Sequence, residues 1–187
     1  MQSVPEIPPS ELSLRRAVPA DVPAITQCVM EAYAPWVPVI GRRPGPMLQD
    51  YASLVRRALV TVAMHTGNVV GVIVLLSTQE EGLLIDNVAV LPSHRGLGIG
   101  KRLLLHAECV ARGLTHRQVC LYTNEKMEAN IALYSKLGYV EYERRQEDGF
   151  RLVFMRKVLR SPSQLGSVQE SGEGTGLPEW RRCDPDS

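Results

Sequence analysis

The sequence predicts one α/β domain in which helices cover a mixed, mostly antiparallel sheet. The chain has 187 residues, enough for one sizeable core. Short runs rich in β-branched residues also alternate with amphipathic helical patterns, in the order β-α-α-β-β-β-α-β-α-β-β. The domain spans residues 12–160, after a flexible N-terminus over 1–11. The Ser-, Gly-, Glu- and Pro-rich residues 161–187 predict a disordered tail, with Trp180 its large apolar side chain.

The first half of the chain predicts one strand and two helices. Alternation indicates a strand from Leu12 to Val18, and Pro19 opens a helix. The buried stripe of that helix has helical spacing: Ile25, Cys28, Val29 and Ala32. Four prolines and two glycines indicate a loop or broken turns over 34–46. A second helix is expected over 47–58, with one face made of Leu48, Tyr51, Ala52 and Val55.

The second half predicts a three-stranded antiparallel meander over 59–64, 69–76 and 83–90. A helix with its end near Gly113 follows, and its expected core residues are Leu103, Leu104, Ala107, Val110 and Ala111. A strand over 118–122 and a helix over 127–137 come next. Strands over 139–145 and 150–157 then form a hairpin around Asp148-Gly149, a strong turn dipeptide.

Composition excludes several classes of partner and site. Lys and Arg number 21 against 20 Asp and Glu, so no basic field favours nucleic acid or an anionic membrane. No apolar run approaches the roughly 20 residues of a membrane span, and residues 1–11 do not resemble a signal peptide. The cysteines are scattered, which predicts reduced thiols, a cytoplasmic protein and no zinc site: Cys28, Cys109, Cys120 and Cys183. The four histidines also lack metal-ligand spacing.

A glycine-rich turn between a buried strand and a helix is the most informative segment. Gly96, Gly98 and Gly100 allow a ligand to approach the backbone, and the first N–H groups of the helix are free to bind phosphate. The turn is not a Walker A loop, because Arg95 and Arg102 replace its first glycine and its Ser/Thr. It is not a dinucleotide loop, because Lys101 replaces the third glycine.

The segment Arg95-Gly96-Leu97-Gly98-Ile99-Gly100 resembles the acetyl-CoA pyrophosphate loop of the GNAT superfamily of N-acetyltransferases. Residues 124–139, an Asn-bearing helix that ends in Leu137-Gly138-Tyr139, resemble a second signature of that family. The two signatures cover about residues 82–144. The resemblance implies an acyltransferase that moves the acetyl group of acetyl-CoA to a primary amine by direct attack in a ternary complex.

The resemblance also implies which residues bind acetyl-CoA. The backbone of the preceding strand would polarise the thioester carbonyl, the turn would hold the pyrophosphate, and two asparagines would contact the rest of the cofactor. These residues are Val88, Ala89, Val90, Arg95, Gly96, Leu97, Gly98, Ile99, Gly100, Lys101, Asn124 and Asn130.

Tyr134 is the candidate acid, since a phenol with a pKa of about 10 can protonate a departing thiolate. Asp86 is the candidate base, and an ordered water chain is the alternative. By strand alternation, its side chain is expected on the same face as those of Val88 and Val90. An equally favoured interpretation is that Asp86 has no catalytic role and forms an ion pair with an Arg at the sheet edge.

The acceptor pocket is expected between the 33–51 region, with Trp36 and Met47, and the hairpin at 148–150. Arg42 and Arg43 could hold an acceptor carboxylate or simply be solvated. A small-molecule amine is favoured over a protein or peptide N-terminus, because no peptide-binding signature is evident. A non-catalytic acyl-CoA sensor is the alternative from another class, against which the pairing of Asn130 with Tyr134 argues. The sequence leaves open a homodimer.

Overall fold

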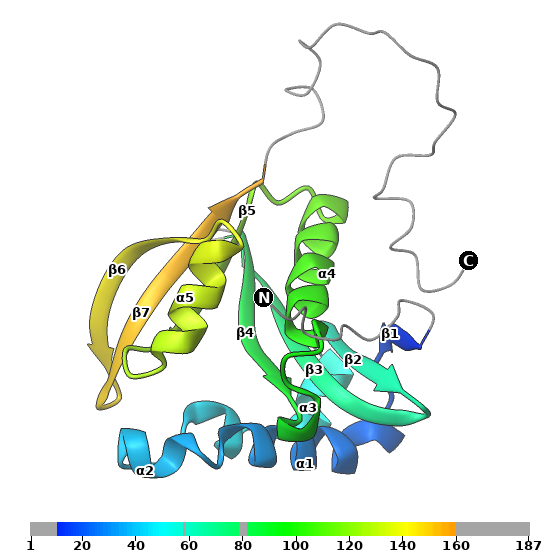
Figure 1. Cartoon of the computed structure of the whole chain (residues 1–187). Coiled ribbons are helices and arrows are strands. Elements are labelled where there is room, and N and C mark those ends of the chain that lie inside the picture. The colour runs from blue at the N-terminus through cyan, green and yellow to red at the C-terminus, as the bar shows by residue number, and fades with distance from the viewer. Residues whose placement is uncertain (1–10, 58, 79–81, 160–187) are drawn as a thin grey trace, which may run out of the picture.

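The computed structural model describes residues 11–57, 59–78 and 82–159. Its sheet has seven strands in the order β1-β2-β3-β4-β5-β7-β6 (Figure 1). β4 and β5 are parallel, and the other neighbouring pairs are antiparallel, which confirms the mixed sheet. The strands are β1 (Leu12–Arg16), β2 (Leu59–His65), β3 (Asn68–Thr78), β4 (Gly82–Val90), β5 (Gln118–Asn124), β6 (Val140–Glu147) and β7 (Phe150–Val158).

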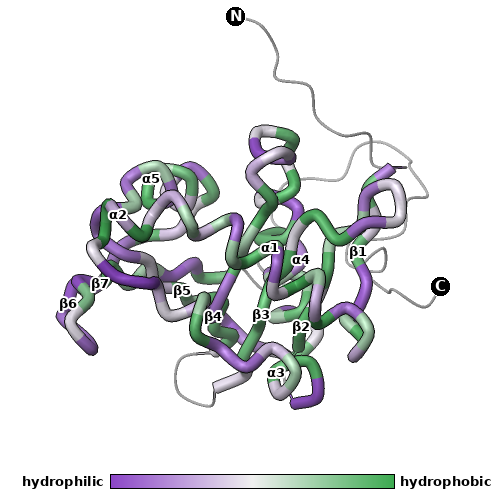
Figure 2. The backbone as a smooth tube through the Cα atoms, turned by 90° about the horizontal axis from the view of Figure 1, so that it is seen from below, coloured by the Kyte–Doolittle hydropathy of each residue, from purple (hydrophilic) through white to green (hydrophobic). Residues whose placement is uncertain are grey.

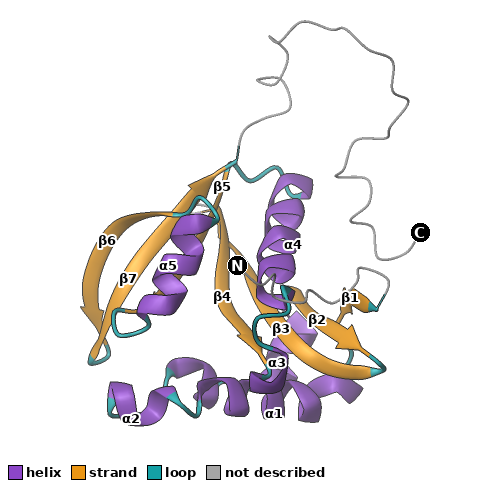
Figure 3. Ribbon diagram, in the orientation of Figure 1, coloured by secondary structure: helices purple, strands orange, loops and turns teal. Residues whose placement is uncertain are grey.

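Helices cover both faces of this sheet (Figure 3). α1 (Val22–Tyr33) and α3 (Tyr51–Arg57) pack on one face, in a core that includes Val62 and Val72. α4 (Ile99–Gly113) and α5 (Glu128–Lys136) cover the other face. The predicted stripe of α1 is confirmed, since its four residues are buried. Figure 2 shows β2 and β3 as largely hydrophobic strands in the interior of the molecule.

Two expectations for the segment before β2 were wrong. The segment predicted as a loop or broken turns contains the short helix α2 (Trp36–Ile40), which ends at Gly41 with φ 90°. The predicted helix over 47–58 begins only at Tyr51, because Gln49 has an extended backbone and the Asp50 carboxylate accepts the Ser53 N–H at 3.0 Å. Leu48 therefore lies in the 3₁₀ turn Gly45–Leu48 and is 66% exposed.

Gly71 fixes the distance between α4 and the sheet. A Cβ at this position would lie 3.1 Å from Ile99 Cγ2 and 3.2 Å from both Leu103 Cδ1 and the Ala89 carbonyl oxygen. The missing side chain therefore lets the first turn of α4 approach β3 closely. In this way the glycine-rich turn is held against the end of β4.

β4 contains a bulge and then separates from β5. Val74 pairs with Asn87 and Leu75 with Ile85, so Asp86 is the extra residue in β4. The parallel ladder with β5 ends at the pair Ile85 and Leu121. Beyond this pair the two strands diverge (Figure 1).

Some expectations fall outside the described residues: the N-terminus over 1–10 and the tail from 160 onward, with Trp180 and Cys183. Within the described ranges, Cys28 is a buried free thiol, and no three His, Cys, Asp or Glu side chains are grouped to hold a metal ion. No helix in that part of the chain has the length and apolar content to cross a membrane.

Candidate active site

The glycine-rich turn leads into α4 with two left-handed residues. Gly96 has φ 78°, and Gly98, the N-cap residue, has φ 79°. A side chain at either position would be strained. The Arg102 N–H donates to the Gly98 carbonyl at 3.0 Å, which closes the first turn of α4. The N–H groups of Ile99, Gly100 and Lys101 thus have no partner within the helix and can bind an anion.

A cavity of about 900 Å³, here called the glycine-loop cavity, lies in front of this turn. Most of the predicted cofactor-binding residues line it: Val88, Ala89, Val90, Arg95, Gly96, Gly98, Ile99, Gly100, Lys101 and Asn130. Leu97 does not, since its side chain packs against the core. Arg95 donates to the Ala32 carbonyl at 2.7 Å and so anchors the end of α1 to the turn.

The backbone of β4 supplies two N–H groups where the strands have parted. The Leu91 N–H donates to Val70 on β3 at 2.9 Å. Because successive residues of a strand point their N–H groups to opposite sides, those of Val88 and Val90 point away from β3, toward the gap. A carbonyl oxygen in this gap could accept a hydrogen bond from them.

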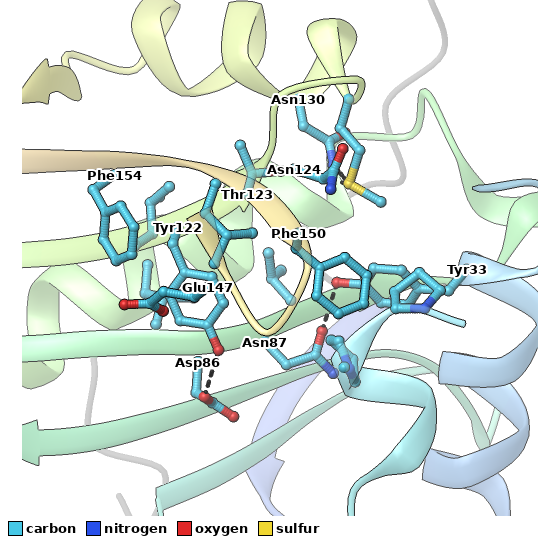
Figure 4. Close-up of a pocket in the computed structure, with 18 of the residues that line it drawn as sticks. Tyr33, Asp86, Asn87, Tyr122, Thr123, Asn124, Asn130, Glu147, Phe150 and Phe154 are labelled. Carbon is cyan, nitrogen blue, oxygen red and sulfur yellow. Dashed lines mark hydrogen bonds between the residues drawn. The ribbon is translucent and has the colours of Figure 1, made fainter. Parts of the chain in front are cut away.

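A second cavity of about 430 Å³, here called the sheet cavity, lies on the other side of the gap (Figure 4). Its wall comes from the segment before α3, from β4 and β5, and from the β6–β7 hairpin. Asn124 lies here and not in the glycine-loop cavity. Its side-chain oxygen accepts the Lys126 N–H at 3.0 Å, in the turn that leads to α5.

The two cavities share four wall residues: Tyr33, Val88, Asn130 and Tyr134. Asn130 and Tyr134 are one turn apart on α5 and therefore face the same way. Tyr134 is 6% exposed, and burial raises its pKa to about 12. Within the described residues its hydroxyl has no hydrogen-bond partner, so it is free to donate to a ligand at the junction of the cavities.

Asp86 lies in the sheet cavity, held by two neutral donors. Gln49 Nε2 donates to one carboxylate oxygen at 2.6 Å, and the Tyr122 hydroxyl donates to the other at 3.0 Å. The expected common face with Val88 and Val90 was wrong. These valines pack on the α4 and α5 side, whereas Asp86 points with Tyr122 to the other face. The bulge at Asp86 reverses the alternation.

Asn87, beside Asp86, fixes the bulge to the helices. Its amide accepts from the Tyr33 hydroxyl at 2.8 Å and donates to that of Tyr51 at 3.0 Å. Tyr51 in turn donates to the Pro46 carbonyl at 2.8 Å. Burial raises the pKa of both tyrosines, which stay protonated. Asn87 was not predicted from the sequence, although a second polar residue in so apolar a strand was a signal for it.

The walls of the predicted acceptor pocket are only partly as expected. Asp148 and Phe150 do line the sheet cavity, but Trp36 lines the glycine-loop cavity and Met47 lines neither. Arg42 bridges two walls instead: it donates to the Asp148 carbonyl at 2.7 Å, and its guanidinium lies 4.2 Å from the centre of the Phe150 ring.

Comparisons with known proteins agree with this geometry. The family model described as an acetyltransferase (GNAT) domain matches residues 56–141. Acetyl transferase GW6a of Oryza sativa subsp. japonica is 45% identical over 58 residues, which are 29% of this chain and only 13% of that protein.

Solved structures extend the likeness beyond the matched segment. An IAA acetyltransferase from Bacillus cereus is 26% identical, with TM-score 0.61, over 79% of this chain and 99% of its own. A GNAT family acetyltransferase from Elizabethkingia anophelis with acetyl-CoA bound shares the fold at 16% identity and TM-score 0.60, over 80% of this chain and 99% of its own. The chain therefore has the fold of the GNAT acetyltransferases, and its residues 56–141 match the GNAT acetyltransferase domain.

Proposed function

We propose that the protein transfers the acetyl group of acetyl-CoA to a primary amine of a small molecule, by direct attack in a ternary complex. The observation that carries this proposal is the junction of the two cavities at Tyr33, Val88, Asn130 and Tyr134. A donor in the glycine-loop cavity and an acceptor in the sheet cavity would meet there without passing through solvent. Such positioning accounts for a large share of the rate in two-substrate reactions.

Acetyl-CoA is the co-substrate, and the glycine turn has the chemistry to hold its pyrophosphate. The free N–H groups at the start of α4 bind phosphate through the main chain, and Arg95 and Lys101 add positive charge beside them. The N–H groups of Val88 and Val90 would polarise the thioester carbonyl, because they are pre-oriented in the gap between β4 and β5.

Tyr134 and Asp86 supply the proton transfers in this proposal. The buried Tyr134 hydroxyl remains protonated at neutral pH and can protonate the departing thiolate of coenzyme A. Asp86, at the bulge two residues before Val88, can accept the proton of the amine directly or through a water. The nitrogen then forms the amide bond while the carbon–sulfur bond breaks.

The test is release of coenzyme A thiol from acetyl-CoA with a panel of small amines, amino acids and peptides, followed by mass spectrometry of the products. We expect a small amine to be acetylated, with one acetyl group transferred for each thiol released. If peptides are acetylated in preference to every small amine, the proposed function is wrong and protein N-terminal acetylation is favoured instead. Tight binding of acetyl-CoA without turnover of any acceptor would favour the sensor.

A further inference from the structure

The charges around the sheet cavity are predominantly negative. Asp86, Glu147 and Asp148 contribute to its wall, and Arg145 is the one basic residue among the described residues that line it. Asp86 has only neutral partners, Gln49 and Tyr122, and forms no ion pair within the described part of the chain. Because Asp86 lies in a largely apolar wall and has no cationic partner, a positively charged group of a ligand could pair with it.

Arg145 is not available to a ligand. Its Nε lies 2.7 Å from a carboxylate oxygen of Glu147, and its Nη1 lies 3.4 Å from Glu143. Its guanidinium is also stacked 4.1 Å from the centre of the Phe154 ring. The charge and one planar face of this arginine are therefore already occupied, so the described residues that line the cavity offer no free cation to an acceptor carboxylate.

Aromatic rings form part of the sheet-cavity wall, on the face of β5 and β7 opposite α4 and α5. Tyr122 on β5 and Phe154 on β7 lie side by side, with ring centres 5.8 Å apart (Figure 4). Phe150 adds a third ring from the β6–β7 hairpin, and Leu84 and Leu152 also contribute to the wall. Flat rings in this arrangement bind an apolar or aromatic group through dispersion and edge contacts.

The carboxylate of Asp86 lies directly beside the aromatic part of this wall. It accepts a hydrogen bond from the Tyr122 hydroxyl, and the Phe154 ring lies next to the Tyr122 ring (Figure 4). An ammonium group beside Asp86 would therefore have its carbon skeleton over Tyr122 and Phe154. A volume of about 430 Å³ lies within the range of small-molecule sites.

On the basis of the function proposed above, we propose that the acceptor is a primary amine on an aromatic or other apolar body, without a carboxylate beside the amine. An α-amino acid would place its carboxylate near Asp86 with no cation to compensate it. Juxtaposed like charges reduce binding strongly. The structure thus favours arylalkylamines over the corresponding amino acids.

Matched acceptors isolate this charge effect in the thiol-release assay. Phenethylamine, phenylalaninamide and phenylalanine share the aromatic ring. Phenylalanine has a carboxylate beside the amine, whereas phenylalaninamide has an uncharged amide of similar size at that position. The expected kcat/KM for phenethylamine is about 100-fold or more above that for phenylalanine. Phenylalaninamide should lie close to phenethylamine. Spermidine, a cation without an apolar body, should be a poor acceptor.

Two variants connect the preference to these residues. Asp86→Asn should reduce the ratio of phenethylamine to phenylalanine kcat/KM, and the ratio is the readout because Asp86 is also the candidate base. Phe154→Leu should raise the KM for phenethylamine and leave that for n-butylamine nearly unchanged. Glu31→Gln, on the exposed side of α1, is the matched control, and melting curves verify the fold of each variant.

The outcomes separate this inference from the function on which it rests. Equal or faster turnover of phenylalanine or spermidine would overturn the acceptor class and leave the acetyltransferase proposal intact. If no acceptor releases thiol, the proposed function fails, and calorimetric titration of the protein with coenzyme A present then decides the acceptor class. Tighter binding of phenethylamine than of phenylalanine would support it, and no binding of either would overturn it.

Discussion

The hydroxyl of Tyr122 on β5 donates a 3.0 Å hydrogen bond to Asp86 on β4, at the point where the two strands separate. Gln49, from the segment before α3, holds the other carboxylate oxygen at 2.6 Å. Two elements far apart in the sequence thus orient one carboxylate toward the sheet cavity. The bulge at Asp86 makes this possible, because it turns the side chain to the face on which both donors lie.

Tyr122→Phe should weaken acceptor use without affecting the cofactor. The ring and its packing against Phe154 remain, and only one hydrogen bond to the carboxylate is lost. Since a bond to a charged group contributes about 1.5 kcal/mol, we expect kcat/KM for the amine to fall about tenfold. Steady-state kinetics with each substrate varied in turn measures this. A change in acetyl-CoA affinity, or an equal loss in Tyr142→Phe, would contradict it.

Gly98→Glu should abolish acetyl-CoA binding and leave the protein folded. Gly98 is the N-cap residue of α4 in a left-handed conformation, at the edge of the glycine-loop cavity. A glutamate there strains the turn and adds a like charge where the pyrophosphate is expected. Calorimetry should show no binding, while circular dichroism remains that of the wild type. Undiminished binding would mean that the phosphate site lies elsewhere.

The sheet, the glycine turn and the core could be predicted because each has a local pattern. The α1 stripe follows from helical spacing, and the Asp148-Gly149 turn follows from residues that adopt positive φ, as both do here. Tyr134 and Asn130 could be placed on one helix face for the same reason. In these segments the local preference and the global fold agree.

The features of the site that could not be predicted from the sequence depend on non-local contacts. The bulge at Asp86 depends on the register between β3 and β4, so strand alternation alone placed this side chain on the wrong face. Gln49 reaches Asp86 because residues 49 and 50 interrupt a pattern that otherwise favours helix. The rings of Tyr122 and Phe154 meet only when β5 pairs with β7, a pairing that no local pattern encodes.

Arg42→Ala should weaken acceptor binding by separating two walls of the sheet cavity. Arg42 connects the segment after α2 to the β6–β7 hairpin, through the Asp148 carbonyl and the Phe150 ring. We expect the acceptor KM to rise about 3- to 10-fold, with kcat and melting temperature little changed. Arg43→Ala is the neighbouring control.

Gly149→Ala provides an independent check of the same bridge. Gly149 has φ 77°, and an added Cβ would lie 2.5 Å from Nη1 of Arg42, so the guanidinium must move. This variant should therefore change the acceptor KM in the same direction as Arg42→Ala. An effect on acetyl-CoA affinity in either variant would show that the bridge does not act on the acceptor side.

His106 should make the fold less stable in acid. Its Nε2 lies 3.0 Å from the Thr61 hydroxyl, between β2 and α4, and burial lowers its pKa. The folded state then binds fewer protons than the unfolded state, so stability is full above the unfolded pKa of about 6.5 and falls as pH drops through the folded value. Urea unfolding from pH 8 to 5 should show a smaller decline in His106→Gln. His116→Gln, which removes a half-buried imidazole bonded to Ser77, is the matched histidine control.

Tyr134→Phe should separate chemistry from binding. The variant keeps the ring, which packs edge-on against Tyr139 with centres 6.2 Å apart, and removes only the hydroxyl at the junction of the cavities. If this hydroxyl protonates the thiolate, kcat should fall by about 10² to 10⁴ while acetyl-CoA affinity stays nearly unchanged. Because burial raises the Tyr134 pKa to about 12, loss of its proton should not reduce wild-type kcat up to about pH 10. Rapid-quench measurement of the acetyl-transfer step across this range tests both points. A Phe variant with the wild-type rate of that step would assign the proton to a water instead.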